Sequence, residues 1–111
     1  MTKITDEYMK DHLKLAKSYS LVILRKTEKR KEPEADKIVW EHGRRNFQLI
    51  EQGLASIVCP INDGSEYSGI KILNVPISEA IKIMDEDEGV KAGIFTYEVH
   101  ACLGFPGSTL A

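Results

Sequence analysis

Two polar side chains in residues 35–53 occupy positions where an amphipathic helix normally carries leucine. The segment reads ADKIVWEHGRRNFQLIEQG, and at about 100° per residue Ile38 and Leu49 mark its apolar stripe. His42 and Asn46 fall in the middle of that stripe, about one helical turn apart. A buried polar group without a partner costs about 1–3 kcal/mol, so either the core supplies partners for these side chains or the stripe opens on a cavity.

A second group of chemistry-bearing side chains is the acidic run at positions 85–88, which reads DEDE and is followed by Gly89. The run ends a predicted helix, where exposed carboxylates are each unfavourable by about 0.3–1 kcal/mol because they face the negative end of the helix dipole. At least one of these acids is therefore expected to be held there for another reason.

Four further residues have a simple structural interpretation beside a functional one. Asp63 belongs to an Asn-Asp-Gly turn signature and either stays in that turn or faces a pocket. Trp40 lies on a flank of the central helix and either lines a ligand pocket or belongs to the core or an interface. Cys59 and Cys102 lie in apolar contexts without metal-ligand spacing, which is typical of reduced, buried thiols.

Composition limits the classes of partner. The 111 residues suffice for one domain, and a net charge of −2 gives no electrostatic reason to bind nucleic acid or an anionic membrane. The longest apolar runs are too short to span a bilayer, and the N-terminus lacks a signal-peptide pattern. We therefore expect a cytoplasmic protein without cofactor or metal, open to a small organic ligand and to protein partners.

Hydrophobic periodicity predicts the elements that position these residues. The predicted elements are a helix within residues 1–20 with Thr5 as N-cap, strands at 21–27, 54–61, 69–75 and 93–103, the helix at 35–53, and a helix with Ser78 as N-cap that ends in the acidic run. We expect the first helix to lie on the body of the domain. This divides the chain into an N-terminal extension (1–20), a domain (21–103) and a C-terminal tail (104–111).

The order strand, helix, strand, strand, helix, strand predicts a ferredoxin-like α+β fold, with a four-stranded antiparallel sheet and both helices on one face. The other face of the sheet then stays bare. Residues 21–24 and 57–59 place apolar side chains on both faces, so the bare face is an exposed apolar patch. A second copy of the chain, related by a two-fold axis, is the economical cover and predicts a homodimer.

An ordered set of residues resembles the YciI-like (YCII-related) family of the dimeric α+β barrel superfamily over about residues 21–103. The set comprises a first strand, His42 within a helix, Gly53-Leu54 at the second strand, Cys59-Pro60 where the family usually has Gly-Pro, Asp63 in the next turn, Ser78-Glu79-Ala80 at a helix start, and Asp87 at the family spacing from Gly93. Two positions depart from the family pattern, because Cys59 replaces a glycine and Glu88 replaces a proline.

The resemblance implies a ferredoxin-like fold, a homodimer whose sheets pack face to face, and a pocket between sheet and helices with a catalytic histidine and aspartate. Carried to this sequence, these two residues are His42 and Asp87. No single activity is attached to the family as a whole, and individual relatives act on small aromatic or lactone-like compounds.

These residues support two hypotheses. In the first, His42 acts as general base, Asp87 orients it, and Asn46 binds a substrate oxygen, with Asp63 and Trp40 as further substrate contacts. Such a pair suits proton abstraction next to a carbonyl, isomerisation or elimination without a metal. In the second, the same pair is a buried hydrogen bond between helices, and the protein is a non-catalytic homodimeric module for ligand binding or assembly.

Overall fold

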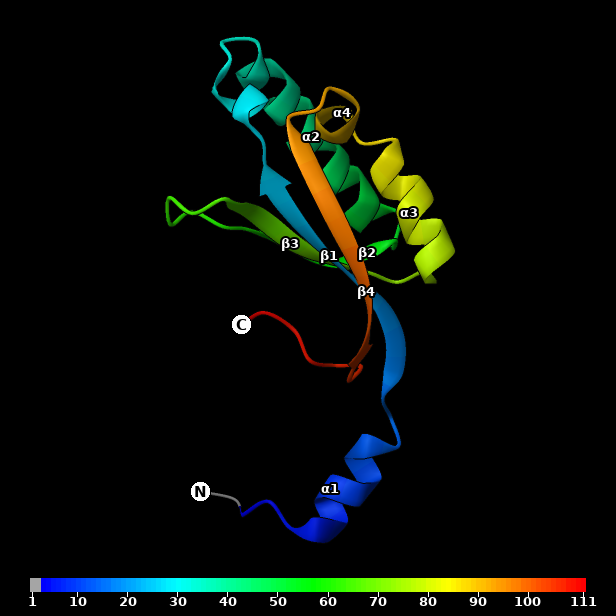
Figure 1. The fold of residues 1–111 in the computed structure, drawn as a ribbon. Helices are drawn as coiled ribbons and strands as arrows, with labels where there is room; N and C mark the ends of the chain where they lie inside the picture. Colours follow the sequence, from blue (N-terminus) through cyan, green and yellow to red (C-terminus); the bar gives the residue numbers. More distant parts are fainter. Residues whose placement is uncertain (1–2) are drawn as a thin grey trace.

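A four-stranded antiparallel sheet with the strand order β2-β3-β1-β4 forms the body of the computed structural model, which describes residues 3–111 (Figure 1). The strands are β1 (Lys17–Lys26), β2 (Ala55–Pro60), β3 (Tyr67–Leu73) and β4 (Phe95–Gly104). The helices are α1 (Asp6–Leu13), α2 (Ala35–Glu51), α3 (Ile77–Asp85) and α4 (Glu88–Lys91), with a 3-10 turn, η1, at Glu28–Lys31. Because α2, α3 and α4 all lie on one side of the sheet, the predicted ferredoxin-like fold is confirmed.

The core lies between this sheet and the helices that cover it. Val22 and Leu24 of β1 and Leu73 of β3 alternate toward the helices, where they are buried with Leu49 of α2 and Met84 of α3. Each such side chain contributes about 1.5–3 kcal/mol when it is fully buried. The apolar core therefore holds α2 against the strands and positions the polar residues of its inner face.

Helix α2 has the predicted amphipathic character. Its buried residues include both polar candidates, His42 and Asn46, together with Ala35 and Leu49. The chain leaves the helix through Gly53, whose φ of 75° lies in the left-handed region, as expected for a glycine after a helix end. Among residues 3–111, no helix is long and apolar enough to cross a membrane.

The N-terminal helix differs from its prediction in length and in place. Its start is confirmed, because the Thr5 hydroxyl accepts a hydrogen bond from the Tyr8 N–H at 3.1 Å. However, α1 ends at Leu13, and β1 begins at Lys17, inside the predicted extension. No residue of α1 is buried, and the helix lies beyond the end of the sheet rather than on the body (Figure 1).

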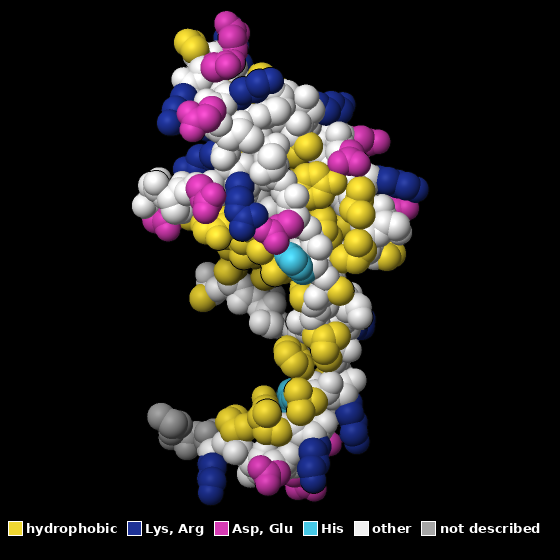
Figure 2. Space-filling view, viewed as in Figure 1, with side chains coloured by type: hydrophobic (Ala, Val, Ile, Leu, Met, Phe, Trp, Pro, Cys, Tyr) yellow, Lys and Arg dark blue, Asp and Glu magenta, His cyan; other side chains and the backbone are white. Residues whose placement is uncertain are grey.

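The cause of this separation is the length of β1. Residues 17–19 pair with residues 102–104 of β4, whereas the pairing of β1 with β3 starts only at Ser20. The first part of β1 thus forms a two-stranded ribbon that carries α1 away from the helices. Figure 2 shows hydrophobic side chains gathered along the side of α1 that faces the rest of the molecule.

The start of α3 and the acidic run also differ from the prediction. The Pro76 carbonyl already accepts from the Ala80 N–H at 3.0 Å, so Pro76 is the N-cap and Ser78 lies in the first turn. The helix ends at Asp85, and Asp87 begins a separate short helix, α4, as its N-cap. A carboxylate at a helix N-terminus is favourable, which reverses the expected cost for Asp87.

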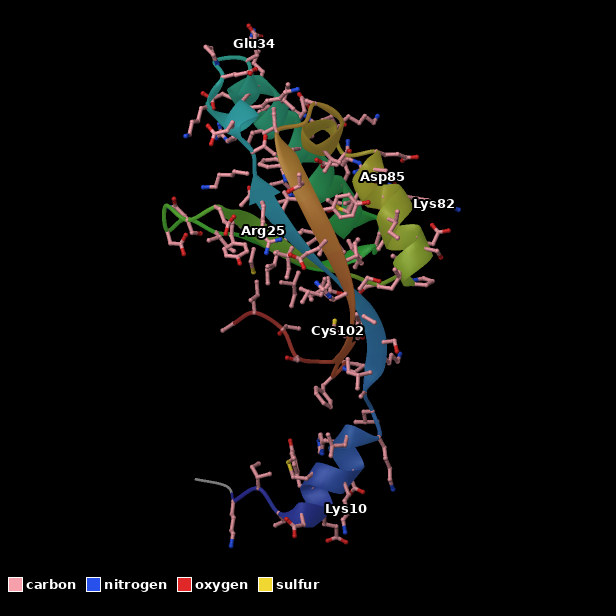
Figure 3. All side chains as sticks on the ribbon, in the orientation of Figure 1. Lys10, Arg25, Glu34, Lys82, Asp85 and Cys102 are labelled. Atoms are coloured by element: carbon pink, nitrogen blue, oxygen red, sulfur yellow. The ribbon has the colours of Figure 1, made fainter. Side chains whose placement is uncertain are left out.

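The sheet face opposite the helices carries a row of half-buried apolar side chains. They include Leu21, Ile23, Ile57, Ile70 and Ile72. Cys59 and Cys102 are on the same face and are free and half-buried rather than buried as expected, because no helix covers them. Figure 3 shows Cys102 and Arg25 on the sheet, away from Lys82 and Asp85 on α3.

The close approach of α4 to the sheet depends on Gly89. A Cβ atom at Gly89 would lie 2.4 Å from ring atom Cδ2 of Phe95, a side chain that is 2% exposed and enclosed by the core. We therefore expect Gly89→Ala to lower the free energy of unfolding by about 1–3 kcal/mol, as measured by urea denaturation.

Gly43→Ala is the matched control for this substitution. A Cβ atom at Gly43, in the interior of α2, would meet no atom within 4 Å. Alanine is the better helix former, so Gly43→Ala is expected to raise the free energy of unfolding by about 0.5–1 kcal/mol. Effects of the same sign from both substitutions would contradict the packing of α4 on Phe95.

Candidate functional site

A small cavity lies between α2 and the helix-facing side of β1, β2 and β3. Its volume is about 180 Å³, which is room for roughly six water molecules. Most of its wall is apolar, and the ionisable or amide side chains that line it on the helix-facing side of the sheet are His42, Asn46 and Lys71. All three are buried, with exposed fractions of 8%, 9% and 3%. Polar groups converging on an otherwise apolar cavity are typical of a small-molecule site.

The His42 ring is held by a buried hydrogen bond to Asp87. Nδ1 of His42 lies 2.7 Å from Oδ1 of Asp87, and the aspartate side chain is fully buried. The second carboxylate oxygen, Oδ2, accepts from the backbone N–H groups of Gly89 and Val90 at 3.0 and 3.1 Å. Asp87 therefore caps α4 and anchors the imidazole at the same time.

A chain of side-chain contacts continues on the other side of His42. Nζ of Lys71 donates to Oδ1 of Asn46 at 2.5 Å, and Nδ2 of Asn46 lies 3.4 Å from Nε2 of His42. An ammonium group can only donate, which fixes the amide oxygen toward Lys71 and the amide nitrogen toward the ring. The consistent tautomer of neutral His42 carries its proton on Nδ1 and leaves the Nε2 lone pair as an acceptor.

The charges around this chain stabilise an ionised Asp87. Burial by itself would raise the pKa of the Asp87 carboxyl. The hydrogen bond and charge of His42, the charge of Lys71 and the Val90 N–H together outweigh burial and hold that pKa below its usual value. Arg45 adds a guanidinium nitrogen 3.8 Å from Oδ1 of Asp87.

Lys71 is a lysine in an unusually dry position. Burial lowers the pKa of Lys71 from 10.5 to about 8, the charge of Asp87 opposes that shift, and the charge of Arg45 adds to it. At neutral pH the ammonium form still dominates, so the cavity has a cation in its wall.

Phe95 packs beside the imidazole and restricts its motion. The two ring centroids are 4.9 Å apart, and the planes are tilted by 55°. Phe95 also packs against Gly89 of α4. The same ring therefore contacts both α4, which Asp87 caps, and His42, which Asp87 binds.

The structure brings three of the five sequence-predicted site residues together and separates the other two. His42, Asn46 and Asp87 form one hydrogen-bonded group. Asp63 is exposed in the turn between β2 and β3, where its Oδ1 accepts from the Ser65 N–H at 2.9 Å, so it does not line the cavity. Trp40 is 69% exposed on the outer flank of α2 and lines a separate surface hollow with Phe47.

Two residues of the site were missed by the sequence reasoning. Lys71 alternates with Ile70 and Ile72 on β3 and so shares the core face with Leu73, a placement that the period of two already indicates. A lysine on a core face was the available signal. Arg45, whose Nη1 donates to the Ile83 carbonyl at 2.6 Å, had no comparable signal because it borders the polar face of α2.

Comparisons with known proteins do not name this site. No family model matches the chain, and a search of curated proteins found no match either. Within residues 3–111, no group of three or more His, Cys, Asp and Glu side chains is placed to hold a metal ion.

The geometry of the site is suited to proton transfer. Nε2 of His42 can accept a proton from a molecule in the cavity, and the Asp87 carboxylate behind Nδ1 would stabilise the resulting imidazolium. The apolar wall strengthens these electrostatic contacts, since charges interact more strongly where water is excluded.

The depressed pKa of Lys71 makes stability depend on pH in the alkaline range. Between pH 8 and pH 10.5 the unfolded chain binds more protons at this lysine than the folded chain does, so folding becomes more favourable as pH rises. We expect the free energy of unfolding of the wild type, relative to Lys71→Met, to increase by about 2 kcal/mol between pH 7 and pH 10.

Chemical denaturation at a series of pH values measures this difference. Other alkaline titrations occur in both proteins and cancel in the comparison. A constant difference between wild type and Lys71→Met over this range would contradict a buried, desolvated ammonium group.

Proposed function

We propose that this protein is a YciI-like enzyme that catalyses proton transfer on a small organic molecule, with His42 as the catalytic base and Asp87 as its positioning residue. The observation that carries the proposal is the buried 2.7 Å hydrogen bond between the two residues, with His42 at the wall of a cavity that Asp87 does not line. The ring is thereby tied to Asp87 at Nδ1, and Nε2 becomes available when a molecule in the cavity displaces the Asn46 amide.

The proposed reaction begins with removal of a proton from a carbon next to a carbonyl. Nε2 of His42 takes the proton, and the electron pair of the C–H bond moves into the carbonyl to give an enolate. An enolate conjugated to a second double bond then regains the proton from the imidazolium at the far end of that double bond, which is isomerisation. An enolate with a leaving group on the next carbon expels that group with its electron pair, which is elimination. Asn46 supports the enolate oxygen through its amide N–H.

The alternative is a non-catalytic module that binds a small ligand or serves in assembly. Three observations favour it: the cavity is small, the His42 residue is only 8% exposed, and both ring nitrogens already have partners. In this alternative the polar chain holds α2, α4 and the sheet together, and ligands bind without reaction.

Exchange of carbon-bound hydrogen for deuterium separates these alternatives. A panel of small ketones, lactones and oxo acids is incubated with the protein in D₂O and followed by NMR. We expect exchange next to the carbonyl of at least one class of compound, and a rate lower by about 100-fold or more with His42→Gln.

His12→Gln is the matched control, because His12 is an exposed histidine on α1, and it should exchange at the wild-type rate. Asp87→Asn should also be slow, since an amide can donate to Nδ1 and so favour the tautomer without a lone pair at Nε2. Binding of compounds without exchange, or equal exchange by His42→Gln, would support the non-catalytic module.

We also propose that the protein is a homodimer, with the open face of the sheet as its interface. The apolar row on that face and the half-buried thiols beside it are the support, because an uncovered patch of this kind is costly in water. Two free thiols further support a cytoplasmic location, where cysteines stay reduced.

Sedimentation equilibrium tests the dimer. Ile72 lies between Leu21 and Ile57 at the centre of the open face, so Ile72→Lys should place a charge in the interface. We expect the wild type at twice the 12.5 kDa mass of the chain and the variant at that mass. Ile81→Lys, on α3, is the control and should leave the mass unchanged. A monomeric wild type, or a dimeric Ile72→Lys, would contradict this interface.

A further inference from the structure

Two cations lie near the buried carboxylate of Asp87, which is the only buried anion among the residues that the structure describes around this group. Lys71 is buried in the cavity wall, and Arg45, outside the cavity, has a side chain that is 15% exposed. Glu86 lies 3.8 Å from Arg45, but its side chain is 74% exposed and its field is screened by water. An excess positive charge in an apolar environment is costly, and an anion from outside would compensate it.

Lys71 is the buried cation of the two, and its ammonium group has more donors than acceptors around it. Its ammonium group has three N–H donors, and the Oδ1 atom of Asn46 is the one acceptor that the described residues provide. The neighbouring wall of the cavity consists mainly of apolar side chains, including Val22, Leu24 and Val58, which cannot accept hydrogen bonds. Donors of Lys71 are thus left over beside the cavity.

We propose that this cavity binds the carboxylate group of a small organic acid, with the Lys71 ammonium as its counter-ion and the Asn46 amide N–H as a second donor. This inference rests on the proposed function for the reaction, and it adds the class of substrate. The cavity volume of about 180 Å³ restricts the ligand to a small acid.

The placement of Lys71 would also orient such a ligand for the base. Nζ of Lys71 and Nε2 of His42 contact opposite ends of the same Asn46 amide, at its oxygen and at its nitrogen. A molecule only a few atoms long can therefore bridge the two groups. A carboxylate on Lys71 would direct the adjacent carbon toward Nε2, and the negative charge of an enolate would stay close to the ammonium group.

Binding of the carboxylate should depend on pH through Lys71. The titratable groups around it are Asp87 beyond His42, and Arg45 and His42 on α2. The Cys59 thiol lies on the opposite face of the sheet. Since the carboxylate binds the ammonium form, affinity should fall as pH rises above the Lys71 pKa of about 8. By linkage, the bound anion should raise that pKa.

Acetate and acetamide form a matched pair of probes, because they have nearly the same shape and differ in charge. Titrations followed by ¹H–¹⁵N NMR at pH 6.5 should give a dissociation constant for acetate at least tenfold lower than for acetamide. The largest shifts should fall on the Asn46 side-chain amide and on Lys71. At pH 9.5 acetate should bind several-fold more weakly, and acetamide should be unaffected.

Two lysine variants identify the counter-ion. Lys71→Met should lose the preference for acetate, whereas Lys82→Met should keep it, because Lys82 is exposed on α3. Equal binding of acetate and acetamide, or shifts confined to another surface, would overturn the inference. If Lys71→Met does not fold, the acetate-to-acetamide ratio of the wild type and its pH dependence decide the question by themselves.

Acetate binding can be tested independently of the proposed proton transfer. Acetate binding needs Lys71 but no proton transfer, so His42→Gln should still prefer acetate over acetamide. Acetate preference without any deuterium exchange would refute the proposed reaction and keep the anion site. Exchange of neutral ketones without acetate preference would refute the anion site and keep the reaction.

Discussion

The buried carboxylate of Asp87 is the constraint on which the helical layer depends. An ionised carboxylate that is completely shielded from water is stable only when its oxygens are saturated with donors. Here one oxygen takes two backbone N–H groups at the start of α4 and the other takes the His42 ring. The break between α3 and α4, and the glycine that lets α4 approach Phe95, both follow from the need to bring those donors to one point.

The two faces of the sheet differ in the side chains that they carry. The helix-facing side combines an apolar core with a chain of polar groups, each hydrogen-bonded to at least one neighbour. The other side carries the apolar row together with Glu98 and His100, and it has no helix on it within residues 3–111. Stability within the chain and the supply of polar groups to the cavity thus come from one face, which leaves the second face free for association.

The fold was accessible from the sequence because its signals are periodic and local. The period of two on β3 and β4 and the stripe on α2 determine which side chains face the core, and that is sufficient for the ferredoxin-like order. Helix boundaries were harder to predict from the sequence. Whether Asp87 ends one helix or caps the next depends on where the His42 ring lies, which is a tertiary contact between residues 45 positions apart.

The candidate site could be predicted from the sequence in part. A histidine and an asparagine on an apolar stripe indicated a buried polar group, and a family resemblance supplied the aspartate. Lys71 could have been found, since a lysine on an inward strand position breaks the pattern of its neighbours. Asp63 and Trp40 were predicted to contact a substrate, but neither lines the cavity. A turn signature and an aromatic residue on a helix flank do not indicate whether a cavity lies nearby.

The donors of the polar chain all point one way, from Lys71 through Asn46 and His42 to Asp87. With that polarity, one arrangement of hydrogens satisfies every contact of a neutral His42 ring. It also means that the lone pair of Nε2 is occupied by the Asn46 amide until another donor replaces it. Asn46 thus occupies the position of a ligand at Nε2. A ligand that enters the cavity displaces the Asn46 amide and exposes the base in the same step.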